Sequence, residues 1–170
     1  LPIHLACKEG HVKIVQELLE YCDCLDPTDM VNDRGQNLLH IACTYANYEL
    51  VRYLLEDRKL EMMINQKDIN GNTPLHLATI SWHPKIVHAL TWDKRVDLSV
   101  LNNDNLTALD ITEVRHGSTS VSLSQRLTWN ALVSAGTPRS SVRFHPKKVE
   151  TDSITFDFYR QAYTTEQYKD

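Results

Sequence analysis

The stretch that decides the fold reads Asp68-Ile69-Asn70-Gly71-Asn72-Thr73-Pro74-Leu75-His76-Leu77-Ala78. Its first four residues have the composition of a tight turn, and Gly71 stands last, where the backbone needs a positive φ. Thr73 is suited to cap a helix, and Pro74 to be its first residue, because the N–H that proline lacks would have no partner there. His76 is then the third helical residue, from which its side chain reaches back to the cap. The stretch therefore predicts a turn followed by a short helix.

The same pattern occurs four times along the chain. The position of His76 is held, at intervals of 36, 36 and 34 residues, by His4, His40, His76 and Asp110. A second apolar segment follows the first three copies at a constant offset: Ile14-Val15 with Leu18-Leu19, Leu50-Val51 with Leu54-Leu55, and Ile86-Val87 with Leu90-Thr91. This spacing is typical of one face of a helix. A pair of such helices cannot enclose that face alone, so neighbouring pairs must stack.

We interpret the repeated histidines as structural residues. Together with Thr73 and Pro74 they form helix caps, and Asp110 keeps a favourable acceptor near the positive end of the fourth helix. Equivalent residues of stacked helices lie about 8–10 Å apart. That separation is too large for one metal ion with bonds of about 2.0 Å, so we expect no metal site.

The stretch quoted first resembles the signature of the ankyrin repeat almost throughout, and the resemblance covers residues 1–116. It implies an all-α solenoid of helix-turn-helix units with protruding turns, in which the first copy is truncated and the fourth degenerate. The usual period is about 33 residues, so the two 36-residue units carry extra residues in their links. Leu1 stands in the middle of a motif, and we therefore expect further repeats before it.

The chain changes character after the repeats. We predict that residues 117–136 form a linker and a capping helix over residues 121–135, which would cover the last apolar face of the stack. Its apolar face would consist of Leu123, Leu127 and Ala131, with Leu132 and Ala135 beside them and Gly136 as the stop. Residues 137–170 show no period and contain a short basic run, so we predict a mostly disordered linker there.

Three segments, residues 32–42, 131–140 and 164–170, are similar to a plant family in which ankyrin repeats precede a PGG-type membrane domain. The accelerated-cell-death regulators belong to that family. The resemblance implies the cytosolic part of a protein that is anchored in the plasma membrane or an endomembrane, acts in plant defence or stress signalling, and is compatible with oligomers. Two alternatives stay open: a soluble ankyrin scaffold or regulator without a membrane half, and the regulatory part of an ion channel.

Composition argues against several functional classes. A net charge of −4 and a pI near 6.1 provide no field for nucleic acid. The five glycines do not cluster into a phosphate loop and no nucleophile motif occurs, so we expect neither catalysis nor a cofactor. Cys7 and Cys43 hold a small, buried repeat position, whereas Cys22 and Cys24 make a poor disulfide pair, so we expect a reduced intracellular chain.

What remains is a surface for a protein partner. In stacked helix pairs, the turn tips and the exposed positions of the first helices line a groove whose residues the core does not dictate. By register, the candidates for partner contact are Arg34, Gln36, Thr44, Tyr45, Asn70, Asn72, Ile80, Ser81, Asp104 and Arg115. The same face includes Lys8, Glu9, Asp33, Ile69, Asn103, Leu106 and Val114. We expect Tyr45, Arg34 and Ile80 to be the energetic hot spots, with Tyr48 and Trp82 as competitors.

Overall fold

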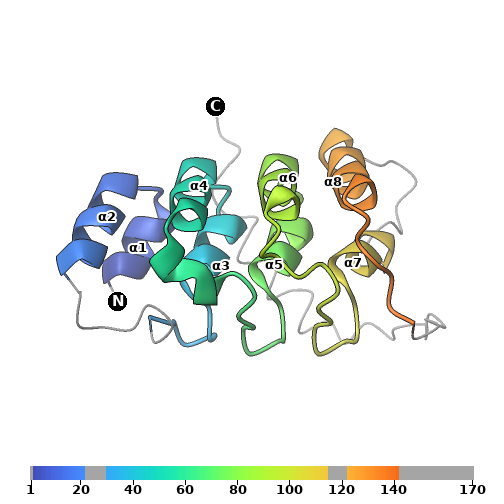
Figure 1. Ribbon diagram of the computed structural model, residues 1–170, viewed down its shortest axis with the longest axis horizontal. Helices are drawn as coiled ribbons and strands as arrows, with labels where there is room; N and C mark the ends of the chain where they lie inside the picture. Colours follow the sequence, from blue (N-terminus) through green and yellow to red (C-terminus); the bar gives the residue numbers. More distant parts are fainter. Residues whose placement is uncertain (1, 22–29, 115–121, 142–170) are drawn as a thin grey trace.

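A computed structural model describes residues 2–21, 30–114 and 122–141, and within these residues it is all-helical, as predicted. The helices form two rows (Figure 1). The inner row contains α1 (Pro2–Lys8), α3 (Leu38–Thr44), α5 (Pro74–Ile80) and α7 (Ala108–Val114). The outer row contains α2 (Val12–Tyr21), α4 (Tyr48–Glu56), α6 (Pro84–Trp92) and α8 (Leu123–Ser134), and the 3-10 helix η2 (Arg58–Met63) follows α4. The four helix pairs stack side by side along the long axis of the molecule.

The inner helices begin where their capping residues stand. Asn37 precedes α3 and accepts the backbone N–H of His40 at 3.0 Å, and its own N–H donates to the His40 ring at 3.3 Å. Thr73 precedes α5, and its N–H donates to Nδ1 of His76 at 3.2 Å. These reciprocal bonds satisfy N–H groups that a helix start leaves without partners.

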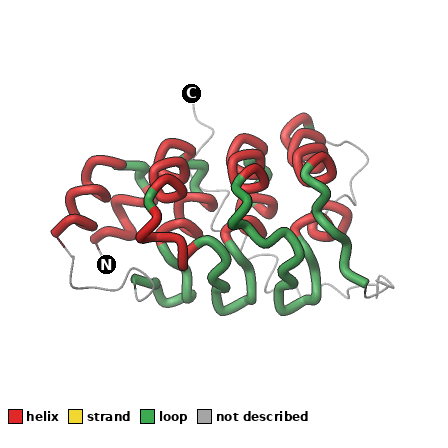
Figure 2. The backbone as a smooth tube through the Cα atoms, in the orientation of Figure 1, coloured by secondary structure: helices red, strands yellow, loops and turns green. Residues whose placement is uncertain are grey.

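The turns lie together along one side of the stack (Figure 2). Each is opened by Asn32, Asp68 or Asn102, whose side-chain oxygen accepts the N–H groups of the residues two and four positions later. The last turn residues, Gly35, Gly71 and Asn105, have positive φ, as the sequence predicted. Neighbouring turns are also joined, because Ile69 N donates to Arg34 O and Asn103 N donates to Asn70 O, both at 3.0 Å.

The outer helices supply much of the core. Leu50 and Leu54 of α4 are buried, as are Ile86 and Leu90 of α6. The prediction fails for Ile14 of α2, which is 47% exposed although its equivalent Leu50 is 1% exposed. Position in the stack explains the difference, since α4 lies between α2 and α6 whereas α2 belongs to the first described helix pair and has a described neighbouring pair on one side only.

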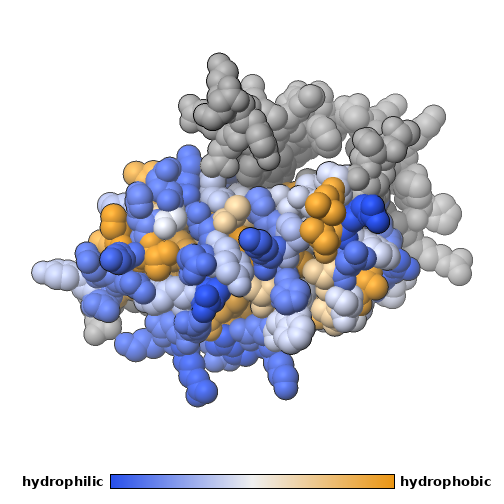
Figure 3. All heavy atoms as spheres, turned by 90° about the horizontal axis from the view of Figure 1, so that it is seen from above, coloured by the Kyte–Doolittle hydropathy of each residue, from blue (hydrophilic) through white to orange (hydrophobic). Residues whose placement is uncertain are grey.

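The last helix lies beside both α6 and α7 and is the outer helix of a fourth pair. The predicted apolar face is wrong in part, because Leu123 is 70% exposed and Leu127 is also exposed. Figure 3, which looks onto the outer row, shows apolar side chains remaining visible over α8. The buried residues are Thr128 and Leu132, with Ala131 partly buried beside them. Residue 121, the predicted helix start, lies outside the described residues, and the helix is instead capped by Ser122.

Candidate partner-binding surface

The two interior helices of the inner row, α3 and α5, offer almost no accessible side chains. All seven residues of α3 are buried, and so are residues 74–79 of α5. A partner approaching this side would therefore meet side chains from the turn tips and from the loops that follow the inner helices. We call these residues the recognition surface: Asp33, Arg34, Ile69, Asn70, Asn103 and Asp104 at the tips, Tyr45, Ala46, Ser81 and Trp82 in the loops, and Ile80 at the end of α5.

The tip residues project from three turns that are hydrogen-bonded to one another. Arg34, Asn70 and Asp104 are exposed, and they differ in charge from one repeat to the next. Ile69 is an exposed apolar residue beside them, and its backbone N–H is held by Arg34 O. The tips thus form a continuous edge with a rigid backbone and variable side chains.

The loops after the inner helices are likewise fixed to neighbouring repeats. Asn47 Nδ2 donates to Cys7 O at 2.6 Å and to Lys8 O at 2.9 Å, and His83 Nε2 lies 3.2 Å from Thr44 O. Tyr45 is exposed, and the Lys8 ammonium lies 5.3 Å from the centre of its ring. This placement is a cation–π contact across two repeats.

Ala46 and Trp82 have backbone conformations that residues with side chains rarely adopt. Their φ angles are 60° and 55°, and the equivalent residue of the first repeat is Gly10, with φ of 72°. A left-handed conformation costs a residue with a side chain roughly 1–2 kcal/mol. Trp82 is half-buried, as is its neighbour Ile80. The register with Gly10 is the sequence signal for these two strained positions.

Several predicted contact residues are inaccessible. Thr44 is buried and its hydroxyl donates to His40 O at 2.9 Å, because a small polar side chain can turn back onto its own helix. Asn72 is buried because its side-chain oxygen accepts a hydrogen bond from Asn102 Nδ2 at 3.1 Å. Leu106 is buried too. Gln36 is half-buried and bonded to Asn32, and Arg115 lies outside the described residues.

The inner-row histidines join each repeat to the next. Nε2 of His40 lies 2.9 Å from Asn72 O, and Nε2 of His76 lies 3.1 Å from Leu106 O. His4 makes a similar contact, 3.1 Å from Met30 O. Because a carbonyl oxygen only accepts hydrogen bonds, Nε2 carries the proton in each of these contacts and donates it to the carbonyl. Sequence reasoning placed the caps but missed these bonds between repeats.

Burial keeps His40 and His76 neutral. It lowers the pKa of His40 to about 4 and that of His76 to about 4, although the carbonyls that they bind act in the opposite direction. Burial likewise raises the pKa of the Cys7 thiol to about 12 and raises that of Cys43. Neutral imidazoles and protonated thiols at these positions fit packing roles. In the described part of the chain, no three His, Cys, Asp or Glu side chains gather as metal ligands would.

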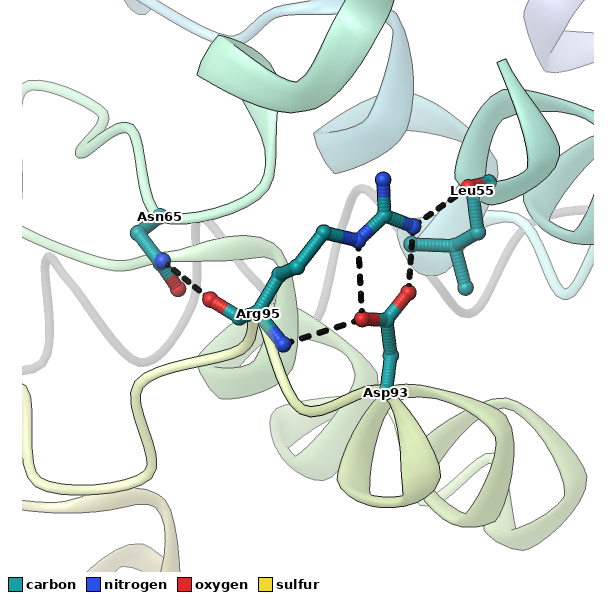
Figure 4. A network of polar contacts seen from close by, with 4 residues as sticks. All are labelled: Leu55, Asn65, Asp93 and Arg95. Atoms are coloured by element: carbon teal, nitrogen blue, oxygen red, sulfur yellow. Dashed lines mark hydrogen bonds and ion pairs between the residues drawn. The ribbon is translucent and has the colours of Figure 1, made fainter. Parts of the chain in front are cut away.

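A polar network joins the end of α6 to the end of α4 (Figure 4). The Arg95 guanidinium contacts both carboxylate oxygens of Asp93 and donates to Leu55 O, one of the last carbonyls of α4. Asn65 Nδ2 donates to Arg95 O at 2.8 Å. This hydrogen bonding, chiefly to the Arg95 side chain, lowers the pKa of Asp93. An adjacent cavity of about 350 Å³ is lined by Leu55, Glu56, Arg58, Glu61 and Arg95. Because Arg95 already binds its own chain, we assign the network to repeat packing.

Comparison with known families gives one match. The profile for Ankyrin repeats (3 copies) matches residues 3–102, while the comparison with curated proteins returned no match. The fourth pair, α7 with α8, lies beyond the matched residues and continues the same stack. None of the described helices is both long and apolar enough to span a bilayer. Ankyrin repeats are modules for protein–protein interaction, and the stacked pairs, projecting turns and capped inner helices have this architecture. The chain belongs to the ankyrin-repeat family.

Proposed function

We propose that the recognition surface binds a protein partner. One observation carries the proposal: positions that build the stack keep their chemistry from repeat to repeat, whereas exposed positions do not. His40 and His76 are alike and bind alike, but their repeats place the exposed Tyr45 and the half-buried Ser81 at equivalent positions. Stacking therefore restrains the first kind of position and leaves the second for recognition.

Within this surface, Tyr45 and Arg34 have the chemistry of interface anchors. Aromatic and arginine side chains are enriched among residues whose truncation costs about 2 kcal/mol or more of binding energy. Both side chains are exposed. The Tyr45 N–H donates to Ile41 O at the end of α3, and Arg34 is bound within its turn through Asn32 and to the next turn through Ile69 N. A fixed backbone reduces the ordering cost of association.

Site-specific photo-cross-linking tests this placement. A photo-reactive phenylalanine analogue at position 45 keeps an aromatic ring on the recognition surface, and the same analogue at position 52 serves as the control. Arg52 is half-exposed on α4 in the outer row. We expect a partner from the source cells to cross-link through position 45 and not through position 52. Equal cross-linking of the same partner at both positions would refute the assignment of the surface.

We further propose that this recognition takes place on the cytosolic side of a membrane, in plant defence or stress signalling. The support is the resemblance of residues 131–140 and 164–170 to the plant membrane family. The reading frame after Asp170 tests it, since a membrane domain requires a stretch of about 20 apolar residues there. A continuing polar sequence would favour the soluble scaffold instead.

A further inference from the structure

The chain turns back toward the inner row after α8. Gly136, with φ of 73°, ends the helix: its N–H donates to Val133 O at 3.0 Å, and Thr137 N donates to Leu132 O at 3.1 Å. This paired arrangement is a Schellman motif. Figure 1 shows the following segment descending past α7 toward the level of the turns. We call residues 137–140 the strap.

Two acidic side chains of the fourth repeat hold the strap. Ser140 N donates to Asp110 Oδ2 at 2.9 Å, and the Arg139 guanidinium pairs with Glu113 Oε1 at 2.5 Å. Thr137, at the start of the strap, is buried. Of the predicted linker over residues 137–170, the structure describes residues 137–141, and the strap within them is bound to α7 rather than separate from the repeats.

Asp110 stands where the interior repeats have histidine. At this position the side chain therefore accepts a hydrogen bond from the following segment instead of donating one to it. His40 and His76 each cap their own helix and donate Nε2–H to a carbonyl of the following turn segment. Asp110 also caps its helix, since Oδ2 accepts Thr107 N at 2.9 Å and the Thr107 hydroxyl at 2.8 Å. A carboxylate, however, only accepts hydrogen bonds. It therefore faces an N–H donor of the strap instead of a carbonyl.

We infer that the strap closes the end of the stack, and that Asp110 is the positioning residue that selects the strap over a further repeat. A fifth turn of the interior kind would bring a carbonyl oxygen against the carboxylate. Two acceptors would then meet without a proton between them, which is unfavourable in a partly buried site. The Ser140 N–H removes this conflict, and the Arg139–Glu113 pair aligns the strap along α7.

The test is hydrogen exchange of the Ser140 amide in Asp110→His. Histidine at position 110 can still cap through Nδ1, as His76 does with Thr73, but its Nε2–H then meets the Ser140 N–H. We expect exchange of the Ser140 amide to become at least about tenfold faster, because a hydrogen bond to a charged acceptor is lost, while the amides of α7 keep their protection. Asp110→Asn retains an acceptor and should leave Ser140 protected. Asp104→Asn, at an exposed tip of the same repeat, is the matched control and should change nothing.

Unchanged protection of Ser140 in a folded Asp110→His protein would overturn the inference. If that variant does not fold, Glu113→Gln provides the decision, because it removes the negative charge that pairs with Arg139 and leaves the cap intact. The loss of an exposed ion pair changes an equilibrium constant, here that for local opening of the strap, by up to about fivefold. We therefore expect exchange of the Ser140 amide to accelerate by a factor within that range. No acceleration in Glu113→Gln would equally contradict the role of the strap.

Discussion

Acidification should destabilise the stack through two of its buried histidines. Burial lowers the folded-state pKa of His40 and of His76 to about 4, whereas an unfolded chain has a histidine pKa of about 6.5. As pH falls below about 6.5, these histidines bind protons in the unfolded state but not in the folded state. Stability is therefore fully present above that pH and is lost progressively down to about pH 4.

The size of the effect follows from the two pKa values. One unit of difference corresponds to about 1.4 kcal/mol, so each histidine should cost about 2 kcal/mol at pH 5 relative to pH 7.5. Both together would remove about 4 kcal/mol, a large part of the roughly 5–15 kcal/mol typical of a domain. His83 contributes in the same direction, since burial lowers its pKa as well. Asp93, whose pKa is lowered, acts at still lower pH.

Urea unfolding followed by circular dichroism at pH 7.5, 6 and 5 measures this loss. His76→Gln is the informative variant, because glutamine keeps a side chain that can reach back to the cap and does not titrate. Its free energy of unfolding should fall by about 2 kcal/mol less than that of the wild type between pH 7.5 and pH 5. A wild-type unfolding midpoint that does not move over this range, or an unchanged pH slope in the variant, would refute the reasoning.

Three further predictions concern stability and are checked by thermal or urea unfolding. Leu54→Asp should lower the free energy of unfolding by more than about 4 kcal/mol and unfold the stack cooperatively, because it places an unpaired charge where a leucine is buried. Leu5→Asp, at an exposed position, should cost little. Comparable losses in the two variants would contradict the register. Gly71→Ala should lower the free energy of unfolding by about 2 kcal/mol or more, because φ is positive there and a Cβ would lie 2.7 Å from Asn103 N. A Cβ at Gly136 meets nothing within 4 Å, so Gly136→Ala should cost only about 1 kcal/mol. The reverse order would show that the turns do not pack as described. Ala46→Gly should stabilise the protein by roughly 0.5–1 kcal/mol, because glycine adopts a φ of 60° without strain. Ala42→Gly, inside α3, should destabilise the protein by at least that amount. A destabilising effect of Ala46→Gly would argue against strain in that loop.

Local features of the fold could be predicted from sequence because their chemistry lies within a few residues. The caps at Thr73 and Asn37 need only the residue three positions later, and the turns ending at Gly35 and Gly71 need only their own backbone. The constant spacing of the repeated motif then indicated that the helix pairs stack on one another. For this reason the helices of the first three repeats followed directly from the sequence.

Features that depend on distant neighbours could not be predicted in the same way. Leu123, Leu127 and Leu132 were all placed on the apolar face of the last helix, but α8 packs on α6 and α7 so that only Leu132 of the three is buried. Asn72 has the composition of an exposed turn, yet Asn102 of the next repeat binds it. The strap depends on Ser140 meeting Asp110, thirty residues earlier, and nothing in the local sequence signals that contact.

The central claim is that the tips and loops, not the outer helices, hold the partner. Isothermal titration of the cross-linked partner against the Arg34→Ala, Tyr45→Ala double variant measures this most directly, with Arg52→Ala of α4 as the reference. We predict that the double variant raises the Kd at least about thirtyfold, which corresponds to about 2 kcal/mol or more of binding free energy. Arg52→Ala should keep the Kd within about twofold of wild type, because the only described ion pairs of Arg52 are exposed ones with Glu49 and Glu56. An unchanged Kd in a folded double variant, or an equal loss in both proteins, would contradict the account.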